Sequence, residues 1–80
     1  MSELTEKEKL QIAIGKQIKL LREERNIPQQ VLAAKCDFDK SNMARLEAGG
    51  TNPTIYTLKK IADNIGVSLS DIVGVIPYSD

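Results

Sequence analysis

The sequence predicts an all-α protein with five helices, and three observations support this. Apolar residues recur every three or four positions along nearly the whole chain, as in amphipathic helices. No segment alternates apolar and polar residues as a half-buried strand would. Residues that start or end helices fall at the breaks between the apolar stripes. We expect a single domain over residues 1–80, with a small core and without repeats or a dividing linker.

The first helix is expected to be long. Thr5 and Glu8 have the spacing of a capping box, which starts a helix, and the apolar stripe that follows ends near Arg25. Asn26 can adopt the left-handed conformation that closes a helix. The members of the stripe are Leu10, Ile14, Ile18 and Leu21.

Residues 28–47 predict two short helices joined by a tight turn. Pro28 suits the first turn of a helix, because its missing N–H would have no partner there. After the turn, Asp39 can cap the next helix by accepting backbone N–H groups. Met43 and Leu46 lie on one face of that helix. The opposite face carries the polar and basic side chains of Lys40, Ser41, Asn42 and Arg45.

Two further helices complete the expected fold. The pair Asn52–Pro53 is expected to open a fourth helix, which Gly66 ends. Ser68 and Asp71 have capping-box spacing for a short fifth helix. The apolar face of the fourth helix consists of Leu58, Ile61, Ala62 and Ile65.

The outer face of the helix over residues 40–48 has the chemistry that reads DNA. In the major groove, Arg and Lys side chains reach guanine, and Ser or Asn reaches several base edges. We therefore predict sequence-specific binding to double-stranded DNA. The side chains expected to face base edges are Lys40, Ser41 and Arg45, with Asn42 nearer the backbone.

The net charge is zero, yet the charges are distributed unevenly. Between Lys9 and Lys60 there are ten basic and five acidic residues, an excess of five positive charges, and the other acidic residues lie towards the two ends. Such segregation suits phosphate contact by a molecule without net charge. Scattered solvated charges would give the same counts, so the pattern supports DNA binding without establishing it.

The composition offers little to an enzyme. Without histidine there is no Ser–His or Cys–His nucleophilic system, and a lone cysteine cannot build a zinc site. Cys36 is expected to be a buried packing residue. We predict no enzymatic activity, no cofactor, no metal and no small-molecule ligand. One cysteine allows no internal disulfide and no apolar run spans a bilayer, so we expect a cytoplasmic protein without a membrane partner.

The motifs along most of the chain resemble those of the Cro/C1-type (XRE-type) helix-turn-helix family of bacterial transcriptional regulators. The matching segments are Ile14–Arg22, Gln29–Ala33, Arg45–Gly49, Asn52–Pro53 and Leu58–Ala62. The match covers about residues 14–73, with an N-terminal helix extension over 1–13 and a C-terminal tail over 74–80. The resemblance implies a lambda-repressor-like domain that binds operator DNA, usually as a symmetric dimer. Phage-type repressors, restriction–modification controllers and antitoxins share this domain.

The resemblance also implies roles for single residues. Gln29 would hold a phosphate and brace Lys40, although a solvated glutamine at a helix start is the alternative. Arg22 and Glu47 match positions that pair between the first helix and the end of the third. Each follows a core leucine, so we expect a structural ion pair rather than two surface charges. Contacts to the DNA backbone are expected from Gln29, Asn42, Thr51 and Asn52.

Several positions depart from the family pattern. Pro28 occupies the place of a capping Ser or Thr, so that cap must come from Asn26 or be lost. Asp37 replaces the usual turn glycine; Asp tolerates a left-handed backbone better than most residues. The loop over 50–52 lacks the Lys or Arg often found there, which implies phosphate contact through backbone N–H groups and short polar side chains.

The C-terminal segment is expected to form a homodimer interface. One helix-turn-helix of this size contacts few base pairs, so specificity generally needs two copies on a palindromic operator. Leu69 and Ile72 are expected to cover the monomer core. The apolar residues then left exposed are Val73, Val75, Ile76 and Tyr78. A tail folded back on its own core is the alternative.

A different function is possible on the same fold. A protein-interaction adaptor would retain the helices without binding an operator. Such an adaptor would have no need for Lys40, Ser41 and Arg45 together. The outer face of the third helix therefore favours the DNA-binding regulator.

Overall fold

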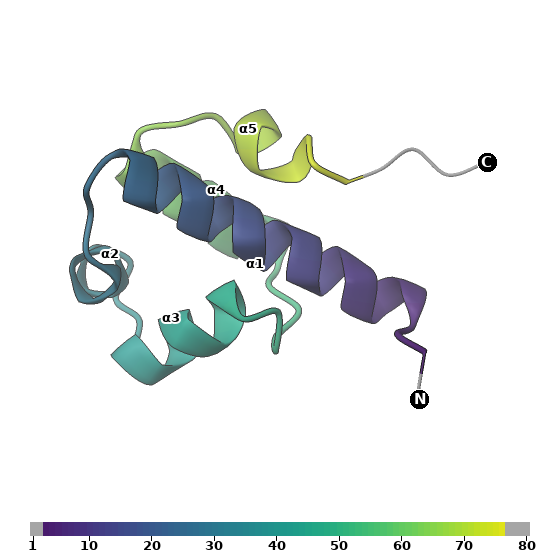
Figure 1. Cartoon of the computed structure of the whole chain (residues 1–80). Coiled ribbons are helices and arrows are strands. Elements are labelled where there is room, and N and C mark those ends of the chain that lie inside the picture. The colour runs from purple at the N-terminus through teal and green to yellow at the C-terminus, as the bar shows by residue number, and fades with distance from the viewer. Residues whose placement is uncertain (1–2, 77–80) are drawn as a thin grey trace.

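Five α-helices make up the part of the chain that the structure, a computed structural model, describes, residues 3–76 (Figure 1). They are α1 (Glu6–Glu24), α2 (Gln29–Lys35), α3 (Lys40–Glu47), α4 (Ile55–Ile65) and α5 (Leu69–Val73). Helix α1 contacts α3, α4 and α5, and α2 contacts α3 and α4. In Figure 1, α2 and α3 lie on one side of α1 and α5 lies on the other. The prediction of an all-α, five-helix fold is confirmed for these residues.

The two predicted capping boxes are both present. The backbone N–H of Glu8 donates to the Thr5 hydroxyl at 3.1 Å, and the Thr5 N–H donates to the Glu8 carboxylate at 3.1 Å. Ser68 and Asp71 repeat this exchange at the start of α5. These backbone hydrogen bonds lower the pKa of Glu8 and of Asp71, because they stabilise the ionised carboxylates.

The starts of the middle helices differ from the expectation. Helix α4 begins at Ile55 rather than at Asn52–Pro53, because the Thr54 hydroxyl accepts the Thr57 N–H at 3.1 Å and supplies the cap. Pro28 is the N-cap of α2, one position before its first turn. Asp39 is the N-cap of α3, but its exposed carboxylate makes no cap hydrogen bond within residues 3–76. The prediction that the Asp39 side chain caps α3 is therefore wrong. Helix α2 also begins without a side-chain cap, the second of the two outcomes expected for Pro28.

The left-handed positions between helices agree with the prediction. Asn26 has a φ of 55° after α1, and Asp37 has a φ of 58° in the turn between α2 and α3. Gly66 ends α4 with a φ of 94°. Asparagine and aspartate can occupy this region at modest cost, so the chain makes two of these turns without glycine.

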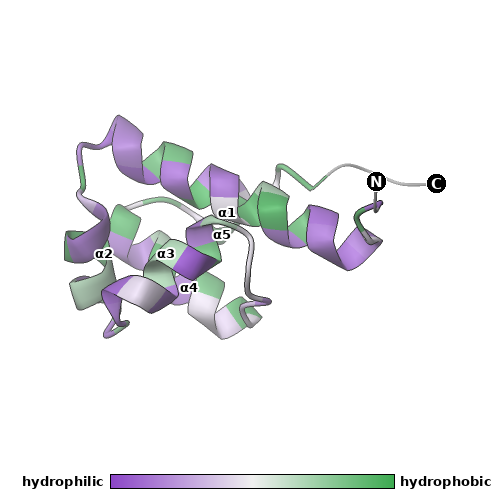
Figure 2. Cartoon of the chain, turned by 60° about the horizontal axis from the view of Figure 1, so that its bottom comes forward, coloured by the Kyte–Doolittle hydropathy of each residue, from purple (hydrophilic) through white to green (hydrophobic). Residues whose placement is uncertain are grey.

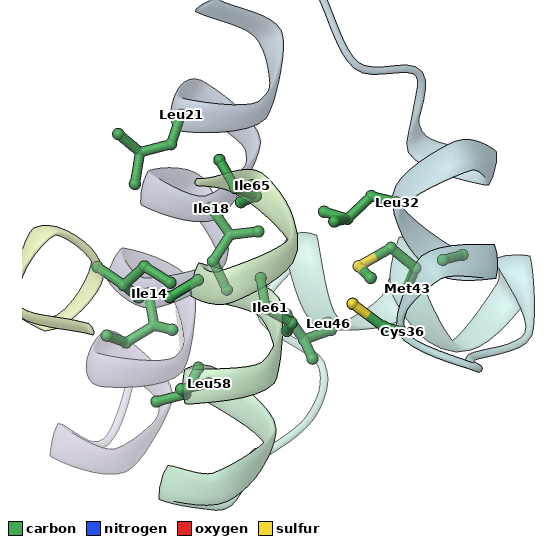
Figure 3. Close-up of a cluster of buried hydrophobic side chains, with 13 residues drawn as sticks. Ile14, Ile18, Leu21, Leu32, Cys36, Met43, Leu46, Leu58, Ile61 and Ile65 are labelled. Carbon is green, nitrogen blue, oxygen red and sulfur yellow. The ribbon is translucent and has the colours of Figure 1, made fainter. Parts of the chain in front are cut away.

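The core lies where the inner faces of the five helices meet (Figure 3). Hydrophobic and hydrophilic segments alternate along α1 in Figure 2, as its amphipathic pattern predicts. Cys36 is fully buried, as expected, and burial raises the pKa of its thiol. The buried hydrophobic residues are Ile14, Ile18, Leu21, Leu32, Ala33, Cys36, Met43, Leu46, Leu58, Ile61, Ala62, Ile65 and Ile72.

The C-terminal segment contributes to this core more than expected. Ile72 is fully buried and Leu69 packs partly against the core, as predicted. Val73 is also half-buried against the core, so the prediction that it is left exposed is wrong. Val75 and Ile76 are exposed, at 38% and 41% of their surface. Tyr78 lies outside the described residues.

Helix α1 crosses the end of α3 at Gly15. A Cβ atom at this position would lie 2.5 Å from the carbonyl oxygen of Glu47 and 2.6 Å from that of Leu46. These are backbone atoms, which cannot rotate out of the way as a flexible side chain can. Glycine at position 15 therefore allows the two helices to approach closely.

We predict that Gly15→Ala destabilises the protein by up to about 2 kcal/mol, because overpacking a close contact usually costs about 1–3 kcal/mol and the change of residue offsets about 1 kcal/mol of this. Alanine has a helix propensity about 1 kcal/mol better than glycine, so the propensity alone would stabilise the variant. Denaturant unfolding measures the net effect. The control Lys16→Ala changes an exposed neighbour and should alter stability by less than about 0.5 kcal/mol. A Gly15→Ala variant as stable as the wild type would contradict the close crossing.

Candidate nucleic-acid interface

Helices α2 and α3 form a helix-turn-helix that is anchored on α4. The turn between them is closed by the Phe38 N–H, which donates to the Ala33 carbonyl at 2.8 Å. The Phe38 ring packs against the core, and the ammonium group of Lys60 on α4 lies 5.3 Å from its centroid. This distance is within the range of a cation–π contact, so the turn is tied to the following helix.

Helix α3 has one buried and one exposed face. Met43 and Leu46 point into the core, and Glu47 is also buried. The side chains predicted to contact DNA are all exposed: Lys40, Ser41, Asn42 and Arg45. Arg45 donates a hydrogen bond from Nη2 to Oδ1 of Asn42, one turn earlier. The predicted base-reading arginine is thus held by the residue that we expected nearer the backbone.

A buried ion pair fixes the end of α3. Arg22 donates from Nε and Nη2 to the two carboxylate oxygens of Glu47, at 2.8 and 2.9 Å. The two side chains are only 8% and 3% exposed. A third donor of Arg22, Nη1, reaches the Ile27 carbonyl at 2.8 Å. The hydrogen bonds to Glu47 raise the pKa of the Arg22 guanidinium. Through Arg22, the network joins α1, the following loop and α3.

Gln29 does not make the expected contact with Lys40. Its amide nitrogen donates to Oε1 of Glu47 at 3.0 Å, so it braces Glu47 rather than Lys40. The reason is electrostatic, because the buried carboxylate needs donors and Gln29, at the start of α2, is within reach. Neither composition nor spacing indicated this contact.

The loop between α3 and α4 is also held by α1. The amide nitrogen of Gln11 donates to the Gly49 carbonyl at 3.0 Å, a contact that sequence reasoning missed. Gln11 lies one helical turn before Gly15, so the two residues share the face of α1 that meets the end of α3. This spacing is the feature of the sequence that could have indicated the contact. Further along, Asn52 is exposed, whereas Thr51 is half-buried. The Thr51 hydroxyl oxygen is shielded and has no hydrogen-bond partner among the described residues.

Two hollows flank this loop. A pocket of about 230 Å³ lies between α3, the loop and the start of α4. A groove of about 440 Å³ lies between the first half of α1, the start of α4 and the residues after α5. The apolar lining of this groove includes Leu10, Ile14, Ile55, Leu58, Val73 and Ile76.

The described part of the chain holds neither a metal-binding cluster nor a membrane-spanning helix. Residues 3–76 contain no group of three His, Cys, Asp or Glu side chains arranged to hold a metal ion. None of the helices described is both long and apolar enough to cross a membrane.

The exposed polar face of α3, on a helix-turn-helix in a five-helix domain, defines the class of a DNA-binding regulator, and comparisons with known proteins agree. A helix-turn-helix family model matches residues 18–72. The immunity repressor protein of Bacillus phage phi105 is 36% identical over 63 residues, 79% of this chain and 44% of the repressor. The control protein C.MunI of a Mycoplasma species is 31% identical over 64 residues, 79% of this chain and 86% of that protein.

A solved structure has the same arrangement of helices. The crystal structure of the restriction–modification controller protein C.Esp1396I superposes with a TM-score of 0.73 at 27% identity, covering 89% of this chain and 96% of that one. The chain thus spans nearly all of this controller but less than half of the phage repressor. The chain belongs to the Cro/C1-type helix-turn-helix family, as its motifs indicated. This places it among DNA-binding transcriptional regulators, and the proteins named are regulators rather than enzymes.

We predict that the Arg22–Glu47 pair behaves as a unit in a double-mutant cycle. Arg22→Met or Glu47→Leu alone should each cost about 3–5 kcal/mol of unfolding free energy, because each leaves a buried charge without its partner. The double variant should cost much less than the sum of the two. Denaturant unfolding of all four proteins gives the coupling.

The exposed pair of Lys59 and Asp63 on α4 provides the matched control. Its cycle should give a coupling of only about 0.3–0.5 kcal/mol, as for other solvated pairs one helical turn apart. Additive effects at Arg22 and Glu47 would show that the two residues do not act as a pair.

Proposed function

We propose that this chain binds a palindromic operator in double-stranded DNA as a homodimer and thereby regulates transcription. The observation that carries the proposal is the state of α3. Its inner face and its end are fixed by the core and by the Arg22–Glu47 pair, while Lys40, Ser41 and Arg45 remain exposed on the outer face. A rigid helix with this outer chemistry suits insertion into the major groove.

Separate groups would read bases and hold the backbone. Ser41 and Arg45 are one turn apart, so both face the same groove floor, and the planar guanidinium of Arg45 matches the O6 and N7 acceptors of guanine. Lys40 adds a second cation at the start of the helix. We assign the backbone contacts to Asn42, to Asn52 and to the backbone N–H of Thr51, because the Thr51 hydroxyl is shielded. Gln29 joins them through the second hydrogen of its amide nitrogen, the first being donated to Glu47.

The dimer would form through the exposed apolar residues after α5. Val75 and Ile76 are exposed, and Ile76 also lines the apolar groove beside α1 and α4. Ile55, which also lines this groove, exposes 75% of its surface. A groove with protruding apolar side chains at its rim can receive the same side chains of a second copy, as a two-fold interface requires.

The named relatives suggest two subtypes. One is an immunity repressor, and the other is a restriction–modification controller of nearly the same length as this chain. For this chain we propose that either role is carried out in the cytoplasm, where a reducing environment suits the buried thiol of Cys36. We favour a small regulator of the controller or repressor kind.

We predict that Arg45→Ala weakens operator binding by about 1–3 kcal/mol and relaxes the preference at one base pair in each half-site. The control Arg45→Lys keeps the charge but loses the bidentate fork. It should therefore lose base preference while keeping more of its affinity for random DNA. Fluorescence anisotropy with the operator, its single-base variants and a random duplex measures both effects.

Two other results would contradict these assignments. Equal losses on operator and random DNA would show that Arg45 contacts only the backbone. A wild-type protein with no affinity for any duplex would favour the protein-interaction adaptor.

We predict that Val75→Asp combined with Ile76→Asp gives folded monomers with much weaker operator binding, because the charges oppose burial of the interface. Leu20→Asp is the control, since Leu20 is 50% exposed on α1 and should tolerate the charge without a change in assembly. Sedimentation velocity measures the mass, and circular dichroism checks the fold. A wild type that stays monomeric at high micromolar concentration without DNA would exclude a stable dimer.

A further inference from the structure

The pocket beside α3 lies between two groups of proposed DNA contacts. One wall is formed by Asn42, Arg45 and Leu46 of α3. The other side is formed by Thr51 and Pro53 of the loop and by Thr57 of α4. The turn residue Phe38 completes the lining. Asn42 and Arg45 are exposed, so the pocket opens on the face of α3 that we assign to DNA.

The lining of this pocket is mainly apolar. Leu46 is only 6% exposed, and the Phe38 ring is fixed by its contacts with the core and with Lys60. The Thr51 hydroxyl oxygen is shielded, and the guanidinium at the rim is engaged by Asn42. A phosphate that entered the pocket would have to give up its hydration, and the only cation there to compensate it is already hydrogen-bonded to Asn42. An apolar group has no such dehydration cost and is stabilised by leaving water.

The major groove offers one apolar group, the methyl on C5 of thymine, which 5-methylcytosine also carries. C5 lies on the side of the pyrimidine that faces its own sugar–phosphate backbone. A methyl group at this position therefore falls between a base edge and the backbone. The pocket occupies the corresponding place on the protein, between Arg45 and Thr51.

We propose that this pocket receives the C5 methyl group of a pyrimidine adjacent to the base that Arg45 contacts. The inference rests on the proposed operator binding and adds a determinant of its specificity. The pocket volume of about 230 Å³ exceeds that of a methyl group, so the C5–C6 edge of the ring enters with it. The hydrogen bond from Arg45 to Asn42 holds the guanidinium at the rim, so the base and the neighbouring methyl are read together.

The test replaces the thymines of the operator by uracil, one position at a time, which removes only the methyl group. At one position in each half-site, wild-type affinity should fall about fourfold per half-site, the factor expected for burying one methyl group. A second pair of operators carries cytosine or 5-methylcytosine at this position in place of thymine. Comparing these two operators shows whether the pocket accepts the methyl group of either base. A gain of the same size shows that both methylated bases fit, and a uracil loss without this gain assigns the pocket to thymine.

Two variants connect the effect to the pocket. Thr57→Met fills it, and Pro53→Ala removes part of its wall, so each should bind thymine and uracil operators nearly equally. Tyr56→Ala is the matched control, because Tyr56 neighbours Thr57 but is 75% exposed and does not line the pocket. This variant should keep the wild-type preference, and thermal unfolding checks that all three proteins fold.

The possible failures can be told apart. Operator binding that is insensitive to uracil at every position and to 5-methylcytosine overturns the methyl pocket alone. The methyl pocket is also overturned if Thr57→Met and Pro53→Ala both keep the full preference for thymine. Absence of any preferred duplex overturns the proposed function together with this inference.

Discussion

The buried pair between Arg22 and Glu47 is the interaction on which the position of α3 depends. Removing two charges from water is costly, and their attraction offsets the cost only when the remaining donors and acceptors are also satisfied. Here Arg22 also bonds the Ile27 carbonyl, and Gln29 adds a third donor to the carboxylate. The network therefore joins α1, the next loop, the start of α2 and the last residue of α3 at one point.

The close approach of α1 to α3 extends this constraint. Gly15 brings the two backbones together, and Gln11, one turn earlier, holds the Gly49 carbonyl just after α3. Met43 fixes the inner face of the same helix in the core. With its inner face and its end immobilised, α3 presents the outer face as a rigid surface, and rigid placement of polar groups is what base recognition requires.

Features that depend on neighbouring residues could be predicted from the sequence. The capping box at Thr5 and the left-handed turns at Asn26 and Asp37 follow from local backbone chemistry, and the apolar stripes follow from helical period. Contacts between distant segments could not be predicted in this way. Gln29 bonds Glu47 because folding places a buried carboxylate beside it, and Val73 is half-buried because α5 packs on the core. The pocket beside α3 likewise needs several segments to form its walls.

Selection of bound sites from a pool of random duplexes tests most directly whether the exposed face of α3 reads DNA as part of a symmetric dimer. We expect one enriched motif with two inverted half-sites, whose centres are separated by about one turn of DNA, roughly 10 base pairs. The same selection with Arg45→Ala should lose the preference at one position of each half-site. Recovery of the starting pool without an enriched sequence, from a folded protein, would contradict base reading by α3.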